Sequence, residues 1–198
     1  MRPLKKLPGT VLSTGGARGV GATFANGTSG GFILVADKWV NALAVTANRI
    51  LGTTAAQVSD TDILTFAAQP DFPRNVTCVA DAAATSHLYI YGYDQFGAAI
   101  MEDLTLNGAT PVVGSKCFAQ VTKITQKARS GAFNFTVGIG VKMGLSRHIL
   151  DNLALTSVGN VYEATRATID ATNNTADFST DPDGSKTHVL VYTSSDVD

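Results

Sequence analysis

The side chains in this sequence that could perform acid–base or nucleophilic chemistry are few and poorly arranged for it. Glu102 and Asp103 are adjacent carboxylates, but neighbours on a strand point to opposite faces, so we do not expect an acid/base pair. A Ser-His-Asp set could be assembled from Ser86, His87 and Asp81. Nothing in their spacing brings the three together, so we expect a solvated loop there.

Metal-binding patterns are equally sparse. The two cysteines, Cys78 and Cys117, stand in strand-like segments, where a free cysteine usually acts as a small buried hydrophobe. The three histidines are too scattered for a zinc site: His87, His148 and His188. A further group of acids could offer oxygen ligands to calcium, but its spacing matches no loop motif: Asp170, Asp177, Asp181 and Asp183. The sequence therefore predicts no metal and no cofactor.

A glycine-rich stretch near the N-terminus is the sharpest local motif. Residues 14–21 read Thr-Gly-Gly-Ala-Arg-Gly-Val-Gly and resemble the cofactor-binding turn of short-chain dehydrogenases, which lies between a buried strand and a helix. The preceding residues 7–12 are too short and broken for such a strand, and Asn26-Gly27 interrupts any helix that follows. None of the five tyrosines has a lysine four residues downstream, as that family's catalytic pair requires. We therefore expect no nucleotide site and no enzyme.

Length and composition favour a soluble globular protein. A chain of 198 residues, of which 44% are hydrophobic and 16% charged, can bury a sizeable core in one all-β domain. No apolar run approaches the ~18 residues that cross a bilayer. Pro8 and Gly9 interrupt the segment after Lys5 and Lys6, so we expect no signal peptide. The sequence thus predicts a protein made in a reducing cytoplasm, with no membrane contact.

The net charge of −1 hides an asymmetry along the chain. Residues 1–49 carry six basic residues against Asp37 alone, and four of the basic residues precede residue 32: Arg2, Lys5, Lys6 and Arg18. Residues 1–31 are rich in Gly, Thr and Ser and cannot bury enough apolar surface to fold alone. We predict an extended basic arm over residues 1–31 that becomes ordered on a partner, with an unstructured terminus as the alternative.

Alternation of apolar and polar residues predicts β-strands through the rest of the chain. The cleanest example runs over nine residues, in which one face is apolar: Phe133, Phe135, Val137, Ile139 and Val141. Turn residues support this pattern, because Asn107-Gly108 is typical of a tight hairpin and residues 181–184 read Asp-Pro-Asp-Gly before a last strand. Only residues 146–155 have helix-like spacing. We predict a mainly β protein, an antiparallel sandwich or barrel-like domain over residues 32–198 with a single core and a short helix near 146–155.

Three tyrosines alternate along one predicted strand: Tyr89, Tyr91 and Tyr93. Leu88 and Ile90 alternate with them, and we expect these two residues to form a buried face on the opposite side. The tyrosines could form a second part of the core or a surface that binds a partner, since tyrosine is enriched at interfaces. Core is the interpretation we favour from sequence.

Several segments resemble virion structural proteins of tailed bacteriophages, both in their amino-acid sequences and in their order along the chain. Residues 69–77 read QPDFPRNVT, residues 94–108 read DQFGAAIMEDLTLNG, and residues 110–118 read TPVVGSKCF. Residues 167–172, ATIDAT, followed by DPDG at 181–184, fit the same group. The likeness covers roughly residues 55–193, and within the group the chain is most similar to head-decorating, or cement, proteins.

This resemblance implies a non-enzymatic protein on the capsid exterior of a virion. Its expected partners are the major capsid protein and further copies of itself, as a homotrimer, with no direct contact to nucleic acid because only the arm is basic. Arg2, Lys5, Lys6 and Arg18 are the expected capsid contacts. A phage neck or tail component is one alternative. A carbohydrate-binding sandwich, with Tyr89, Tyr91, Tyr93 and Trp39 as stacking platforms, is another.

Overall fold

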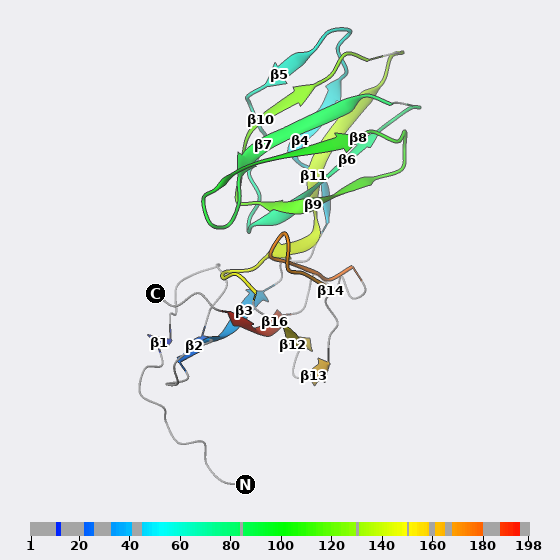
Figure 1. Cartoon of the computed structure of the whole chain (residues 1–198). Coiled ribbons are helices and arrows are strands. Elements are labelled where there is room, and N and C mark those ends of the chain that lie inside the picture. Colours follow the sequence, from blue (N-terminus) through cyan, green and yellow to red (C-terminus); the bar gives the residue numbers. More distant parts are fainter. Residues whose placement is uncertain are drawn as a thin grey trace, which may run out of the picture.

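The computed structural model of the chain describes a series of segments with gaps between them: residues 11–12, 22–25, 33–40, 45–83, 85–129, 131–149, 151–158, 161–164, 168–179 and 187–194. Within them the neighbouring strands pair in antiparallel fashion and no helix occurs. The expected mainly β, sandwich-like fold is confirmed (Figure 1).

Two facing sheets form a sandwich in the upper half of Figure 1. The first has the strand order β5 (Thr61–Ile63), β10 (Gln120–Gln126), β7 (His87–Tyr93) and β8 (Ala99–Thr105). The second is centred on β11 (Asn134–Gly144), which pairs on one edge with β6 (Arg74–Ala80) and through it with β9 (Val112–Phe118). The other edge of β11 is shared by β4 (Thr46–Ala55) and, farther along, by the hairpin of β15 (Thr175–Asp177) and β14 (Thr168–Asp170).

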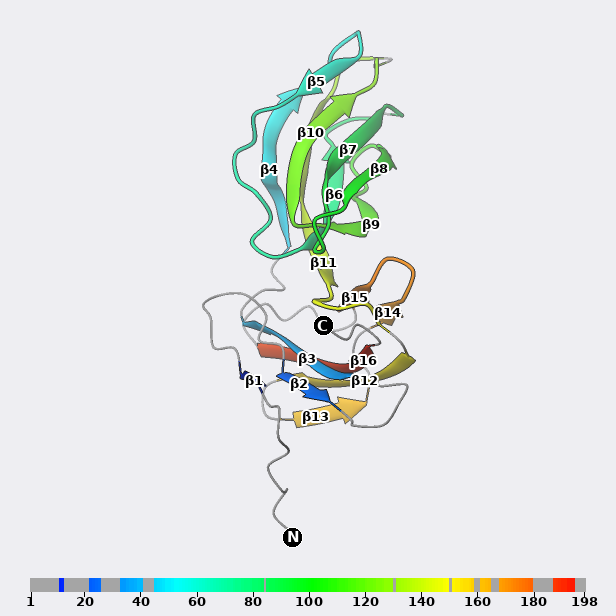
Figure 2. The ribbon, with the colours of Figure 1, turned by 60° about the vertical axis from the view of Figure 1, so that its left-hand side comes forward.

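A third sheet lies below the sandwich, as Figure 2 shows. It consists, in order, of β1 (Val11–Leu12), β2 (Ala22–Ala25), β3 (Ile33–Val40), β16 (Thr187–Ser194), β12 (Asp151–Val158) and β13 (Val161–Ala164). The closing strand β16 therefore pairs with the early strand β3 over eight residues of each. Parts of the expected arm, β1 and β2, belong to this sheet, and the remainder of residues 1–31 lies outside the described residues.

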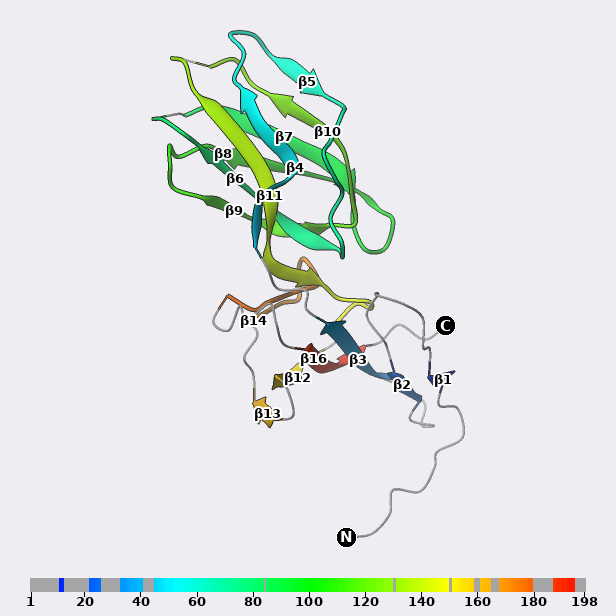
Figure 3. The ribbon, with the colours of Figure 1, turned by 180° about the vertical axis from the view of Figure 1, so that it is seen from behind.

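Buried apolar residues form two clusters rather than the single core expected from sequence. The larger fills the sandwich and contains residues such as Ile50, Leu88, Phe118 and Val137. The smaller lies where the end of β11 meets β3 and β16: Val35, Met143, Leu145, Ala176, Phe178, Leu190 and Tyr192. Strand β11 runs from one cluster into the other (Figure 3).

No helix occurs among the described residues of the segment 146–155, where one was expected. Residues 151–158 are strand β12, which pairs with both β16 and β13, and residues 145–149 form an irregular connection. The apolar spacing of Ile149, Leu150 and Leu153 was compatible with either element over so short a stretch. Pairing with two neighbouring strands, which local sequence does not reveal, decides the outcome.

The alternating pattern from Phe133 onward is confirmed as the buried face of β11. Phe133, Phe135, Val137 and Ile139 are buried, whereas Val141 is only half-buried. The Asn107-Gly108 turn is also present, and Thr110 N donates to Asn107 O at 3.1 Å. Only Gly108 has a positive φ, 56°, so the turn has one left-handed position rather than the expected two, the pattern of a type II′ turn.

Candidate functional site

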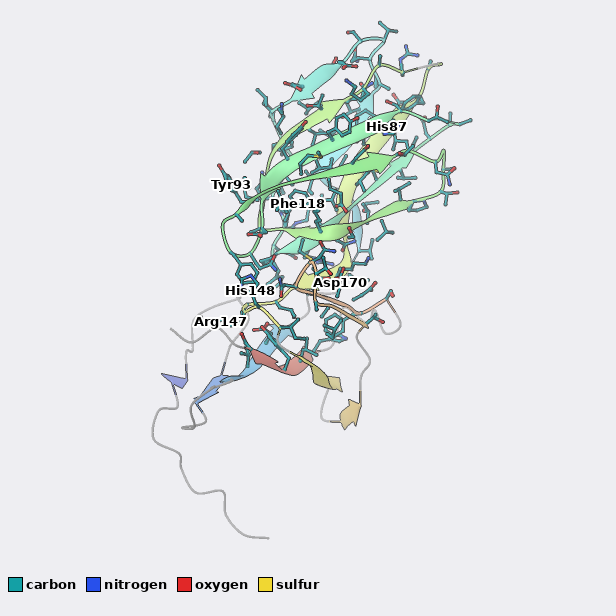
Figure 4. The ribbon with its side chains drawn as sticks, in the orientation of Figure 1. His87, Tyr93, Phe118, Arg147, His148 and Asp170 are labelled. Carbon is teal, nitrogen blue, oxygen red and sulfur yellow. The ribbon has the colours of Figure 1, made fainter. Side chains whose placement is uncertain are left out.

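Strand β7 presents its tyrosines to the outside of the sandwich. Leu88 and Ile90 are buried, as expected, whereas Tyr89 and Tyr91 are half-buried and Tyr93 is 44% exposed. Figure 4 shows His87 and Tyr93 near the two ends of this strand. The favoured interpretation of the tyrosines as core is wrong, because the inward places on β7 are already filled by the aliphatic residues.

The register of the sheet places a defined neighbour on each side of two tyrosines. Tyr91 lies between Lys123 of β10 and Met101 of β8, and Tyr89 lies between Thr125 and Asp103. The Nζ of Lys123 stands 4.5 Å from the centroid of the Tyr91 ring, and Lys127 Nζ stands 5.9 Å from that of Tyr89. These are cation–π distances, and they hold the two rings in place on the sheet.

The lysines on this face pair with carboxylates, and His87 contacts a third carboxylate. Lys123 lies 3.5 Å from Asp62, His87 Nδ1 lies 2.9 Å from Asp103, and Lys127 pairs with Asp60. The pKa of the Asp60 carboxyl is lowered, chiefly by its hydrogen bond from Lys127, and that of Asp62 is lowered, chiefly by its hydrogen bond from Thr125. We name this surface the tyrosine face; it consists of Asp60, Asp62, His87, Tyr89, Tyr91, Tyr93, Met101, Asp103, Lys123, Thr125 and Lys127.

The residues that could have formed a triad do not assemble. Ser86 is buried, and its hydroxyl donates to the backbone oxygen of Lys127 at 2.7 Å. Asp81 accepts hydrogen bonds from the backbone and side chain of Asn134. His87 bonds instead to Asp103 and Thr105 on the neighbouring strand. Each group is engaged in a separate structural contact, so this set is not arranged for nucleophilic catalysis.

The adjacent carboxylates Glu102 and Asp103 face opposite ways, as expected for a strand. Asp103 belongs to the tyrosine face. Glu102 is buried, and its Oε1 accepts hydrogen bonds from Ser115 N at 2.6 Å and Ser115 Oγ at 2.9 Å. Glu102 thus ties β8 to β9 across the edge of the sandwich, a role its sequence position does not reveal.

The aspartates considered as calcium ligands are used in local turns. Asp170 accepts from the backbone of Thr172 and Asn173, and Asp177 accepts from Ser179 N and lies 3.8 Å from Lys142 Nζ. Within the part of the chain that the structure describes, no cluster of His, Cys, Asp or Glu could hold a metal ion. Asp181 and Asp183 lie outside that part.

Both cysteine thiols are buried and protonated. Burial raises the pKa of Cys78 to about 12 and raises that of Cys117 as well. Cys117 pairs in register with Asn75, three residues before Cys78 on β6. At ~3.3 Å per residue the two cysteines are separated by roughly 10 Å along the strand, beyond the reach of a disulfide.

A buried acid, Asp37, lies at the junction between the sandwich and the third sheet. It is 1% exposed. Its Oδ2 accepts from Ser146 N at 2.8 Å and from the Tyr192 hydroxyl at 2.9 Å, and its Oδ1 accepts from Ser146 Oγ at 2.5 Å. Desolvation raises the pKa of Asp37 despite these bonds. In the sequence Asp37 is only a lone acid in a basic segment, because its partners are 109 and 155 residues away.

Because the pKa of Asp37 is raised, we expect the unfolding free energy to depend on pH. The folded state holds a proton that the unfolded state, with the ordinary pKa of 3.8, releases as the pH rises. The stabilising contribution is therefore complete below pH 3.8 and is lost as the pH rises through the raised pKa. In urea denaturation, the unfolding free energy of the parent chain should fall relative to Asp37→Asn across that window. A difference that does not vary with pH would contradict the assignment.

The predicted contact residues of the arm, Arg2, Lys5, Lys6 and Arg18, lie outside the described residues, as does the glycine motif at 14–21. The strands that flank this motif, β1 and β2, pair with each other in antiparallel register. A dinucleotide-binding turn requires a strand followed by a helix, so this setting does not match one. Trp39 lies on β3, opposite His188 in the third sheet, and so is not on the sheet that carries the tyrosines.

Comparisons with known proteins identify no relative of this chain. No family model, no curated protein and no solved structure matches it. Among the described residues, no helix is long and apolar enough to cross a membrane.

Proposed function

We propose that this chain is a non-enzymatic virion structural protein that binds and stabilises the shell of a tailed-phage capsid, as a decoration protein. The observation that carries the proposal is the outward tyrosine face on the four-stranded sheet. The likeness of residues 55–193 to phage structural proteins and the confirmed β-sandwich support it further.

The chemistry of the tyrosine face suits a protein partner. Tyrosine and methionine are enriched at protein interfaces, and the charges around them are already paired. Rings held by cation–π contacts lose little freedom on binding, which lowers the entropic cost of association. We assign binding to Tyr89, Tyr91, Tyr93 and Met101, and selection of the partner to the surrounding charges.

The proposal is tested by adding the purified chain to capsids that lack it. Changing both Tyr89 and Tyr91 to serine should weaken capsid binding by about a hundredfold, because buried interface tyrosines often contribute ~1–2 kcal/mol each or more. The unfolding free energy should fall modestly, because each replacement removes a half-buried ring and its cation–π contact but leaves the inward side chains of β7 in place. Binding is measured by co-sedimentation with the particles.

A matched control uses exposed apolar residues that are not part of the tyrosine face. Val58 and Leu64 are large apolar residues that are mostly exposed and lie outside the tyrosine face. Changing both to serine should leave capsid binding unchanged. If the tyrosine variant still saturates capsids at the parent concentration, the tyrosine face is not the docking surface.

The basic arm provides a second, separable part of the interaction. Arg2, Lys5, Lys6 and Arg18 would contact acidic capsid surface and make binding sensitive to salt, whereas the paired charges of the tyrosine face would not. Changing Arg2, Lys5, Lys6 and Arg18 to glutamine should therefore remove most of the salt dependence of capsid binding, while β1 and β2 stay in the chain. A trimeric state would multiply both contacts through effective concentration.

A carbohydrate-binding sandwich is the second candidate, since tyrosines on a flat face can stack on sugar rings. The lysine over each of the Tyr89 and Tyr91 rings already occupies part of that position, which favours a protein partner. Glycan-array binding that the tyrosine variant loses would reverse this preference.

A neck or tail component would share the same face. The copy number per particle separates it from a decoration protein.

A further inference from the structure

A pocket of about 360 Å³ opens at the junction between the sandwich and the third sheet. Its wall combines Asp37 of β3, Ser146, the segment Pro70–Pro73 before β6, and Gln95 of the β7–β8 turn. In Figure 1 this turn is the loop that extends down from the sandwich. The volume is in the range that holds small ligands.

The pocket contains a buried carboxylate that no cation neutralises within the described residues. Asp37 receives three hydrogen bonds, from Ser146 and Tyr192, and forms no ion pair there. A carboxylate has about four acceptor positions, so one remains. Burial disfavours the charged form of Asp37 and raises its pKa, and a cation that entered the pocket would favour that charged form.

A second acceptor in the same wall is also unused. Gln95 donates from Nε2 to Asn174 O at 3.1 Å, which fixes the orientation of the amide. Its Oε1 is shielded from solvent and accepts no hydrogen bond within the described residues. A buried amide oxygen without a donor costs free energy that a ligand N–H would recover.

The remaining wall fits the apolar part of an organic cation. Phe72 offers an aromatic ring, and Pro70, Pro73 and Leu145 supply aliphatic surface. The Asp71 carboxylate lies in the same wall and already pairs with Arg74 at 3.3 Å. Among the described residues, no group of His, Cys, Asp or Glu side chains here could hold a metal ion. The donor set therefore suits an N–H cation.

We propose that this junction pocket binds a guanidinium or ammonium group, held by Asp37 and the Gln95 amide oxygen with its carbon stem against Phe72. The group can come from the basic arm of this chain or from a separate molecule. The inference stands apart from capsid binding, because it concerns a different surface from the tyrosine face.

The test titrates the full chain with N-acetyl-arginine amide and follows binding by nuclear magnetic resonance and calorimetry. The matched probe is N-acetyl-citrulline amide, which has the same shape but no charge. We expect the arginine probe to bind with shifts at Ser146 and Gln95 and the citrulline probe to bind at least about tenfold more weakly. Asp37→Asn should weaken arginine binding by a similar factor, whereas Asp103→Asn on the tyrosine face should not change it.

If Asp37→Asn does not fold, Gln95→Leu provides an independent reduction in affinity. A synthetic peptide of residues 1–20 identifies the source: competition with the arginine probe assigns the pocket to the arm, and lack of competition assigns it to a separate cation. Equal binding of arginine and citrulline, or binding of the arginine probe that both variants retain, would overturn the proposal. So would no binding at any concentration that the probe's solubility permits.

Discussion

Replacing Gly138 by alanine is expected to destabilise the sandwich strongly, because the added methyl group would force two strands apart. A Cβ at this position of β11 would lie 2.0 Å from the backbone oxygen of Thr46 and 2.5 Å from the backbone carbon of Ala47. Both contacts are to backbone, so β4 would have to move away from β11. Overpacking of this kind costs on the order of 3 kcal/mol, which we expect as a loss in unfolding free energy by urea titration.

Gly52 provides the matched control, since it lies on β4 itself and a Cβ there would meet nothing within 4 Å. Gly52→Ala should change the unfolding free energy by no more than about 0.5 kcal/mol. The direction of this change is expected to be an increase, because alanine restricts the unfolded chain more than glycine does. A Gly138→Ala chain as stable as Gly52→Ala would mean that β4 does not approach β11 as closely as described.

The second large effect is expected from Asn75, a fully buried amide in β6. Its Nδ2 donates to Gly114 O at 3.1 Å and its Oδ1 accepts from Lys142 N at 2.9 Å, so it joins β9 to β11. Asn75→Ala leaves two buried backbone groups without partners, at ~1–3 kcal/mol each. We expect a loss of about 3 kcal/mol and, at ~2–4 °C per kcal/mol for a chain of this size, a melting temperature lower by about 10 °C.

Asn134→Ala is the control for this substitution. Asn134 is at the exposed start of β11, where its side chain bonds to Asp81 at 2.6 Å. Exposed hydrogen bonds contribute little, so the loss should be ~1 kcal/mol or less. If the two asparagine variants have the same melting temperature, the bridge through Asn75 does not contribute the stability assigned to it.

Sequence reasoning predicted the fold class because that information is local. The alternation from Phe133 to Ile139 predicts a strand, and the glycine at the 107–108 turn predicts a turn, without reference to any distant residue. The third sheet could not be predicted in the same way, because β3 pairs with β16 from the other end of the chain. Residues 146–155 show the same limit, since their pairing partners decided between helix and strand.

For the candidate site, the sequence predicted which residues of β7 share a face but not which face is buried. The period of β7 correctly separated Tyr89 and Tyr91 from Leu88 and Ile90, but periodicity does not tell which face is inward when both are apolar. Gln69 is a further case: its side chain bonds to both N and O of Val121, so it replaces a missing strand neighbour at the irregularity in β10. A glutamine before a proline gives no sequence signal of that role.

The passage of β11 through both apolar clusters has a consequence for how the chain avoids misfolding. The residues that β11 contributes share one parity, from Phe135, Val137 and Ile139 in the sandwich to Met143 below it. A slip of one residue against β6 would turn the apolar side chains of both clusters outward together. The pairing of β11 with β6 is irregular between Ile139 and Met143, so this double cost applies to a slip of the whole strand. Near-native alternatives are thereby penalised twice, and the correct pairing is separated from them by a wider gap in free energy.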